Sequence, residues 1–201
     1  MPKLTEEQSD ALRELINIGI GNAAGMLSEM IEFHIQLQIP EVEVLSPLEL
    51  QNQLKHRLGS EPLSSVKLGF SGSFAGGAQL VFPTESAATL VAVLTGEDVG
   101  NPDLDALKVS TLSEVGNIVI NGVMGSIGNV LNRPLDYAVP SYSEEEVEHL
   151  LPSSKSEEEG AVLLAPARFS IEELHVQGDV IIFFDVGSFE VLLEAIAAIL
   201  A

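Results

Sequence analysis

The spacing of hydrophobic and polar residues predicts two long helices, each followed by strands and shorter helices. A helical period runs from Thr5 to about residue 32 and from Asn101 to about residue 132, so each stretch is predicted to be a helix of about 28 residues. Thr5 and Gln8 form a capping box, and Asn101 and Pro102 supply an N-cap and a proline at the first helical position. Strands are predicted by alternation at 35–39, 66–68, 79–82, 135–142, 161–176 and 179–184, and closing helices near 84–95 and 187–200.

The second half of the chain repeats the first at an offset of 100 residues. The matching pairs are Glu14 and Glu114, Asn17 and Asn117, Ile18 and Ile118, Ile20 and Ile120, Gly25 and Gly125, and Pro40 and Pro140. Farther along, an offset of 102 pairs Gly76 with Gly178, Phe82 with Phe184, Ser86 with Ser188, and Leu90 with Leu192. Each unit is predicted to run long helix, strand, short helix, two strands, helix.

Neither unit is large enough to bury a good core of its own, so both are expected to share one. The predicted fold class is α+β (mixed), with two pseudo-symmetric repeats sharing one β-sheet and two long amphipathic helices on it. Residues 1–201 are expected to form a single domain, with repeats of about 1–100 and 101–201.

A helical wheel divides each long helix into an apolar face and an opposite polar stripe. The predicted apolar faces contain Leu12, Leu15, Ile16, Gly19, Ala23, Met26 and Met30 in the first helix, and Leu112, Val115, Gly116, Val119, Val123 and Val130 in the second. The polar stripes contain Asp10, Glu14, Asn17 and Gly21 in the first helix, and Ser110, Glu114, Asn117 and Asn121 in the second. Any amphipathic helix has a polar face, but the same Glu-x-x-Asn at matched positions of both repeats indicates a shared site.

Glycines interrupt both long helices, although each costs about 0.8–1 kcal/mol relative to alanine in a helix interior. Inward-facing glycines are predicted to allow close packing against the sheet or the sister helix. Outward-facing glycines, such as Gly21 and Gly128, are predicted to let another macromolecule approach.

The composition excludes several classes of function. Nine Lys and Arg against 30 Asp and Glu give a net charge of −21, which repels nucleic acid and anionic membranes. With no cysteine there is no disulfide, thiolate nucleophile or cysteine-based metal site. The apolar runs are shorter than the roughly 20 residues of a membrane span, and the first residues lack the apolar stretch of a signal peptide. A cytoplasmic location without membrane insertion is therefore expected.

Other motifs in the chain compete with this interpretation and are weaker. Residues 19–24 match G-x-G-x-x-A, a dinucleotide-binding pattern, but they continue a helix instead of following a strand. The glycines of 69–77 predict turns, Ser71 and Ser73 lack a nucleophile elbow, and the acidic stretches 143–146 and 156–159 predict a helix start and a solvated loop. No metal site is predicted from the scattered histidines His34, His56, His149 and His175.

The two motifs resemble the signature of the CheC-type phosphatases of bacterial chemotaxis, a family that includes CheX and FliY. That signature is Asp or Ser, three residues, Glu, two residues, Asn, twenty-two residues and Pro. The matches are Asp10, Glu14, Asn17 and Pro40, and then Ser110, Glu114, Asn117 and Pro140. Two motifs distinguish the chain from CheX, whose single active helix works in a dimer, and a C-terminal flagellar-switch domain like that of FliY is not expected.

The resemblance implies hydrolysis of the aspartyl phosphate on a phosphorylated CheY-like response regulator, with Mg²⁺ bound in the regulator and no cofactor on this chain. Asn17 and Asn117 would orient the attacking water, and Glu14 and Glu114 would pair with the regulator's active-site lysine. Docking contacts are expected from Asp10, Gly21, Ser110 and Asn121. Alternatively, the chain is a binding module that sequesters the phosphorylated regulator or acts through the deamidase CheD.

Overall fold

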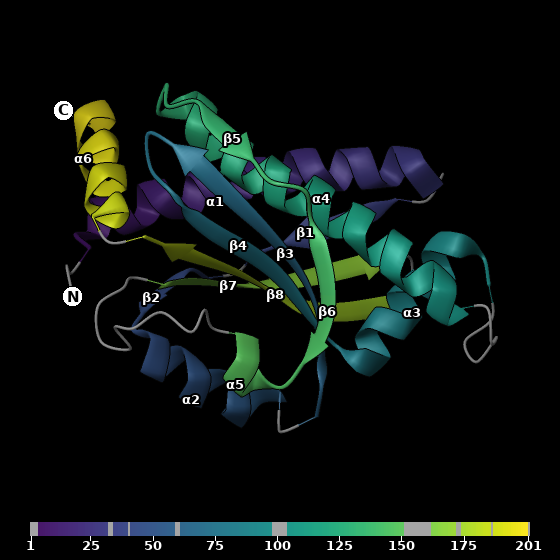
Figure 1. The fold of residues 1–201 in the computed structure, drawn as a ribbon. Helices are drawn as coiled ribbons and strands as arrows, with labels where there is room; N and C mark the ends of the chain where they lie inside the picture. Colours follow the sequence, from purple (N-terminus) through teal and green to yellow (C-terminus); the bar gives the residue numbers. More distant parts are fainter. Residues whose placement is uncertain are drawn as a thin grey trace.

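The computed structural model describes residues 4–31, 34–39, 41–58, 61–97, 104–150, 162–171, 174–185 and 187–200. The elements of this part, drawn in Figure 1, are α1 (Glu6–Ile31), β1 (Ile35–Gln38), β2 (Glu43–Leu45), α2 (Pro47–Leu58), β3 (Leu63–Gly72), β4 (Gly76–Pro83), α3 (Thr84–Thr95), α4 (Leu104–Val130), β5 (Leu135–Tyr137), β6 (Ser141–Glu145), α5 (Val147–Leu150), β7 (Val162–Ile171), β8 (Leu174–Phe184) and α6 (Ser188–Leu200). The predicted order of elements is confirmed in both halves. Each half also has a short additional strand, β2 or β6.

The strands form one antiparallel sheet in which the two halves are interlocked. The strand order is β1-β7-β8-β4-β3-β5, with β2 also pairing with β7 and β6 with β3. Exchanging each strand for its counterpart in the other half reverses this order, so the sheet has pseudo-twofold symmetry. The outer strand of each half lies on the hairpin of the other half, which confirms the predicted shared sheet.

The pairing register defines which residues of the two halves are equivalent. The cross-strand partners are Glu43 with Leu164, Ser143 with Ser65, Ser65 with Val81, and Leu164 with Ile181. Strands β4 and β8 are therefore related by 100 residues, and the predicted offset of 102 is wrong for these strands. The residues that this offset matched, Gly76 with Gly178 and Phe82 with Phe184, are each two positions away from the equivalent residue. Side chains alternate along a strand, so residues two positions apart lie on the same face of the sheet.

Helices cover both faces of the sheet. Residues of α1, α3, α4 and α6 share a hydrophobic cluster with strand residues such as Val66, Leu80 and Ile182. Residues of α2 and α5 share a second cluster with alternate strand residues such as Val81 and Ile181. Figure 1 shows α2 and α5 on one side of the sheet, with α1 and α4 on the other. The fold is thus a sheet between two helical layers, and the thicker layer contains both long helices.

Most of the predicted apolar faces are buried, with two corrections. Leu12, Ile16 and Val119 are buried as predicted, whereas Met26 is 53% exposed and Val130 is 45% exposed. These two residues lie toward the C-terminal ends of their helices. A helical wheel gives only the direction of a side chain around the helix axis and does not show which turns of the helix are covered by other elements. The side chain of Met30 lies outside the described residues.

The described residues include some of the predicted helix caps and acidic stretches. The Thr5 amide donates to Gln8 Oε1 and the Gln8 amide to Thr5 Oγ1, at 3.0 and 3.1 Å, which confirms the capping box. The predicted cap at Asn101 and Pro102 and the predicted loop at 156–159 lie outside the described residues. The stretch 143–146 was predicted to start a helix, but residues 141–145 form β6, and the helix begins at Val147.

One charged group is buried between the sheet and α2. Asp179 on β8 is 1% exposed, and its carboxylate forms an ion pair with Arg57 of α2. Burial raises the pKa of Asp179, and the charge and hydrogen bond of Arg57 oppose that shift. Gln79, the equivalent residue on β4, donates to the Leu150 carbonyl of α5 at 2.8 Å. Each short helix is therefore tied to the sheet by one buried polar residue.

Among the described residues, none of the helices has the length and apolarity that crossing a membrane requires.

Candidate functional site

The two long helices pack against each other through glycines. A Cβ atom on Gly19 of α1 would lie 2.6 Å from the Cα of Val123 on α4 and would also clash with the Gly122 carbonyl oxygen. A Cβ atom on Gly116 would lie 2.5 Å from Val66 of β3. Glycine therefore lets the helices approach each other and the sheet closely, as predicted for inward positions. Figure 1 shows α1 and α4 side by side on this face, running in roughly opposite directions.

The first motif lies along one side of α1. Asp10 and Glu14 are exposed, and Asn17 is half-buried. Asp10 Oδ1 accepts a hydrogen bond from Arg13 Nη2 at 2.8 Å, and both side chains remain largely in solvent. Gly21 is exposed, and a Cβ there would meet nothing within 4 Å. The stripe therefore presents a carboxylate, a carboxamide and bare helix backbone to the surroundings.

The second motif occupies the equivalent positions of α4. Ser110 and Glu114 are exposed, whereas Asn117 and Asn121 are half-buried. The Ser110 hydroxyl donates to the Leu107 carbonyl within the helix at 3.0 Å. Asn121 Nδ2 donates to Asn117 Oδ1 at 2.8 Å. Asn121 was predicted only as a docking residue, although its i, i+4 spacing from Asn117 is a signal that could have indicated this contact.

The two stripes differ in how far their surroundings are covered. Ile18, next to Asn17, is 42% exposed, whereas the equivalent Ile118 is 6% exposed. Gly128 is also covered, since a Cβ there would lie 2.8 Å from the Arg133 carbonyl oxygen, so the prediction that Gly128 is open to a partner is wrong. The site on α4 is therefore the more enclosed of the two.

Neither motif glutamate has a charge partner within the described part of the chain. The ion pairs found there join Asp10 to Arg13, Glu148 to Lys55, Asp179 to Arg57, Glu145 to Lys67, and Glu144 to Lys108. Glu14 and Glu114 take part in none of them and are exposed. In a chain of net charge −21, two unpaired carboxylates at matched positions suit a cationic group on a partner.

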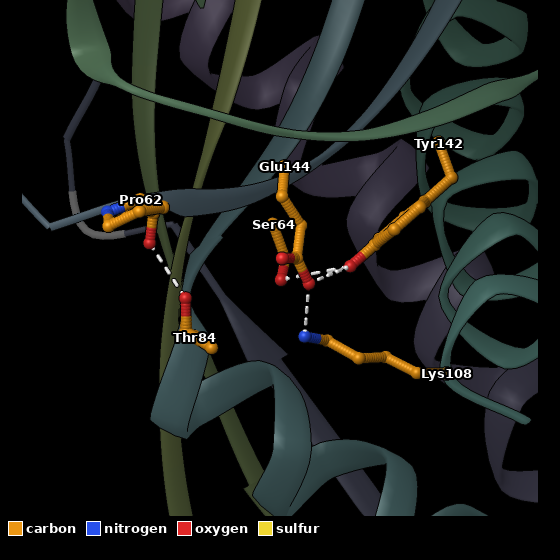
Figure 2. A network of polar contacts seen from close by, with 6 residues as sticks. All are labelled: Pro62, Ser64, Thr84, Lys108, Tyr142 and Glu144. Atoms are coloured by element: carbon orange, nitrogen blue, oxygen red, sulfur yellow. Dashed lines mark hydrogen bonds and ion pairs between the residues drawn. The ribbon is translucent and has the colours of Figure 1, made fainter. Parts of the chain in front are cut away.

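A polar network that the sequence did not indicate ties the start of α4 to the sheet (Figure 2). Lys108 Nζ forms an ion pair with Glu144 of β6, and the Tyr142 hydroxyl donates to Glu144 Oε1 at 2.8 Å. Tyr142 also shares a hydrogen bond with Ser64 of β3 at 3.3 Å. Close by, the Thr84 hydroxyl donates to the Pro62 carbonyl at 2.7 Å and ties the start of α3 to the entry of β3.

This network holds the turns of α4 that precede Glu114. The equivalent positions in the first half are the capping residue Gln8 and the apolar residues Val42 and Val44. The two motif helices therefore occupy equivalent positions in the fold, but different interactions hold their N-terminal turns. On α1 the interaction is a capping box, and on α4 it is an ion pair with the sheet.

The stability that this ion pair supplies is expected to depend on pH. The hydrogen bond from Lys108, together with that from Tyr142, lowers the pKa of Glu144. Burial alone would lower the pKa of Lys108, but the hydrogen bond to Glu144 and the nearby Tyr142 reverse that effect and raise it. A lowered carboxyl pKa stabilises the fold above the unfolded-state pKa, and this contribution is lost as the pH falls through the folded-state pKa.

Lys108→Met is therefore expected to lower the free energy of unfolding at pH 7, by about 1 kcal/mol or less because Glu144 is half exposed. The loss should shrink as the pH falls from the unfolded-state pKa of Glu144 toward its lowered folded-state pKa, because the carboxylate that Lys108 contacts then becomes protonated. Urea unfolding of both proteins at pH 7, 5.5 and 4 measures this difference. A difference that does not change with pH would mean that Lys108 acts through packing.

The competing sequence motifs do not form sites. Residues 19–24 lie in the interior of α1, as predicted. The glycine-rich stretch 69–77 forms the end of β3, the turn and the start of β4, also as predicted. Within the described ranges, no three His, Cys, Asp or Glu side chains are grouped so that they could hold a metal ion.

Comparison with known proteins is consistent with this geometry. A family model described as CheC-like matches residues 7–44, which include the first motif. The CheY-P phosphatase CheC of Bacillus subtilis (strain 168) is 28% identical over 148 residues, which cover 70% of this chain and 68% of the relative. The chain is therefore similar in sequence to the CheC-like family. The flagellar motor switch phosphatase FliY of the same organism is 24% identical over 139 residues, covering 68% of this chain but only 35% of FliY.

Two solved structures share the fold. A crystal structure of Thermotoga maritima FliY superimposes with a TM-score of 0.76 at 18% identity, covering 98% of this chain and 99% of that one. A chain in the crystal structure of a CheX-CheY-BeF3-Mg²⁺ complex from Borrelia burgdorferi gives a TM-score of 0.54 at 20% identity, covering 86% of this chain and 98% of that one. The mixed α+β fold predicted from the sequence is confirmed.

Proposed function

We propose that this chain hydrolyses the aspartyl phosphate of a phosphorylated CheY-like response regulator. The observation that carries the proposal is the pair of matched Glu-x-x-Asn motifs on two exposed helix stripes of a CheC-like protein. Relatives named as CheY-P phosphatases and a CheX structure in complex with CheY support the choice of substrate. The reaction and its partner would be cytoplasmic.

Aspartyl-phosphate hydrolysis requires little covalent chemistry from the phosphatase. The acyl phosphate is already reactive in the regulator, whose Mg²⁺ neutralises phosphoryl charge, so placing one water in line with the phosphorus atom suffices. A hundredfold acceleration corresponds to about 2.7 kcal/mol. This chain therefore needs one polar group at the correct position and no metal of its own.

A carboxamide suits that task. Asn17 and Asn117 each offer an oxygen that accepts a hydrogen bond from the water and an NH₂ group that donates a hydrogen bond to a phosphoryl oxygen. The group is neutral, so it does not repel the phosphoryl group as a carboxylate would. The attacking water loses its proton to solvent or phosphate as the phosphorus–oxygen bond to the aspartate breaks.

The glutamates are assigned to binding. Glu14 and Glu114 lie three residues, nearly one turn, before the asparagines and have no cationic partner among the described residues. A lysine in the regulator's active site would form a charge-assisted hydrogen bond with them and so orient the asparagine. Asp10, Gly21 and Ser110 lie on the same stripes and would contact the docked partner.

Replacing both glutamates by glutamine is expected to raise KM more than it lowers kcat. The change removes a charge-assisted hydrogen bond of about 1.5–3 kcal/mol that forms on docking and persists into the transition state. Steady-state kinetics of Glu14→Gln/Glu114→Gln at several salt concentrations measure the effect, and added salt should weaken the wild type more than the variant. Glu85→Gln/Glu190→Gln, which makes the same charge change on α3 and α6, should leave KM unchanged.

The deciding experiment is phosphate release from a purified, phosphorylated CheY-like regulator in Mg²⁺, with and without this chain. Catalytic amounts of the chain should accelerate release over many turnovers. Sequestration would instead slow release or leave its rate unchanged and would require stoichiometric chain. Acceleration that requires added CheD would favour action through that deamidase.

A further inference from the structure

The two motifs differ at the position four residues after the asparagine. On α4 this residue is Asn121, whose Nδ2 donates to Asn117 Oδ1 at 2.8 Å. On α1 it is Gly21, and a Cβ atom there would meet nothing within 4 Å. Among the described residues, no side chain donates a hydrogen bond to Asn17. Within the described part of the chain, Asn117 thus has a side-chain hydrogen-bond donor, and Asn17 has none.

We propose that Asn121 is a positioning residue that fixes the Asn117 side chain for reaction and makes the site on α4 the faster of the two. This inference rests on the proposed phosphatase function. It adds to that function an inequality between the two sites, set by Asn121 and Gly21.

The hydrogen bond leaves Asn117 able to do its chemistry. A carboxamide oxygen has two lone pairs, so Asn117 Oδ1 can accept from Asn121 and from a water at the same time. Both N–H bonds of Asn117 remain available, and accepting a hydrogen bond at the oxygen makes the NH₂ group a better donor. The contact therefore restricts the side-chain torsions without using up the groups that catalysis needs.

Restricting the Asn117 side chain before the regulator binds should increase the rate of the reaction. Asn17 must lose its rotamer freedom when the water and phosphoryl group are engaged, whereas Asn117 has lost much of it already. Ordering one side chain in an interface typically changes an equilibrium or rate constant by about threefold to tenfold. An inequality of that size between the sites is expected, mainly in kcat.

A contribution to folding stability does not explain why position 121 is an asparagine. Its Oδ1 is buried without a hydrogen-bond partner among the described residues, which disfavours the folded state. Asparagine is also a poorer helix former than alanine. Asn121→Ala should therefore leave the unfolding free energy unchanged or raise it, while slowing the reaction. A merely structural role predicts a loss of stability.

The test isolates each site and exchanges the residue. Asn17→Ala leaves only the α4 site, and adding Asn121→Ala to it should lower kcat about threefold to tenfold with KM nearly unchanged. Asn117→Ala leaves only the α1 site, and adding Gly21→Asn should raise kcat by a similar factor, because the new side chain can donate to Asn17. Phosphate release from phosphorylated regulator in Mg²⁺ is the readout, with urea unfolding of every variant.

Controls separate the hydrogen bond from helix propensity. Gly21→Ala fills the same position on the docking stripe with a side chain that lacks a donor, so Gly21→Asn should have the higher kcat of the two. Asn121→Leu keeps a side chain of similar size without a donor or an added charge and should behave like Asn121→Ala. An unchanged kcat in Asn17→Ala/Asn121→Ala, or equal gains from Gly21→Asn and Gly21→Ala, would overturn the inference while wild-type activity upholds the proposed function. If the wild type accelerates no phosphate release, the proposed function fails and this inference fails with it.

Discussion

Asn17→Ala combined with Asn117→Ala is expected to reduce phosphatase activity by roughly a hundredfold or more, a loss of about 2.7 kcal/mol of transition-state stabilisation. Each substitution removes the group assigned to hold the attacking water, and alanine cannot substitute for a carboxamide as acceptor or donor. Because that interaction forms only for the attack, kcat should fall and KM should stay close to the wild-type value. Initial rates of phosphate release over a range of regulator concentrations measure both.

The double variant should remain folded. Asn17 and Asn117 are half-buried on the outer stripes, and alanine has the higher helix propensity, so the free energy of unfolding should change little. Asn22→Ala/Asn129→Ala is the matched control, since it makes the same change at exposed asparagines of α1 and α4 away from the stripes, and it should keep full activity. Full activity in Asn17→Ala/Asn117→Ala would refute the assignment, and each single variant should keep part of the activity.

The fold could be predicted largely because it is repeated. Two copies of one pattern made the order of elements and the shared sheet predictable, and α3 was predicted at its observed bounds, Thr84–Thr95. Residues 43–45 and 141–145 were harder to assign as strands, since β2 and β6 are short and β6 includes two glutamates. β2 depends on pairing with β7, and β6 depends on pairing with β3 and on ion pairs with Lys67 and Lys108. All of these partners lie far away in the sequence.

The exposure of the candidate glutamates could be predicted from the sequence, whereas the contacts of the candidate residues could not. Periodicity placed Glu14 and Glu114 on exposed stripes, and the structure agrees. The hydrogen bond from Asn121 to Asn117 depends on side-chain torsions, which the pattern of polar residues does not define. The covering of Gly128 depends on where the chain turns after α4, which lies beyond any helical wheel.

The close approach of α1 and α4 is the feature that places both motifs in one rigid layer, and Gly19 controls it. Gly19→Ala is expected to destabilise the protein by about 2 kcal/mol. The added methyl group meets backbone atoms of Gly122 and Val123, which cannot rotate away, so the helices must separate at a cost of about 3 kcal/mol. The higher helix propensity of alanine returns about 1 kcal/mol of this.

Gly25→Ala makes the same chemical change six residues later in α1, where a Cβ atom meets nothing within 4 Å. It should therefore stabilise the protein by about 0.8–1 kcal/mol, so the two alanine substitutions are expected to have opposite signs. Urea unfolding of both variants beside the wild type decides the matter. Equal effects would mean that α1 and α4 do not touch at Gly19 in solution. If the two changes in unfolding free energy have opposite signs, the stability lost in Gly19→Ala is the cost of separating the two motif helices, because the gain in helix propensity is the same at both positions.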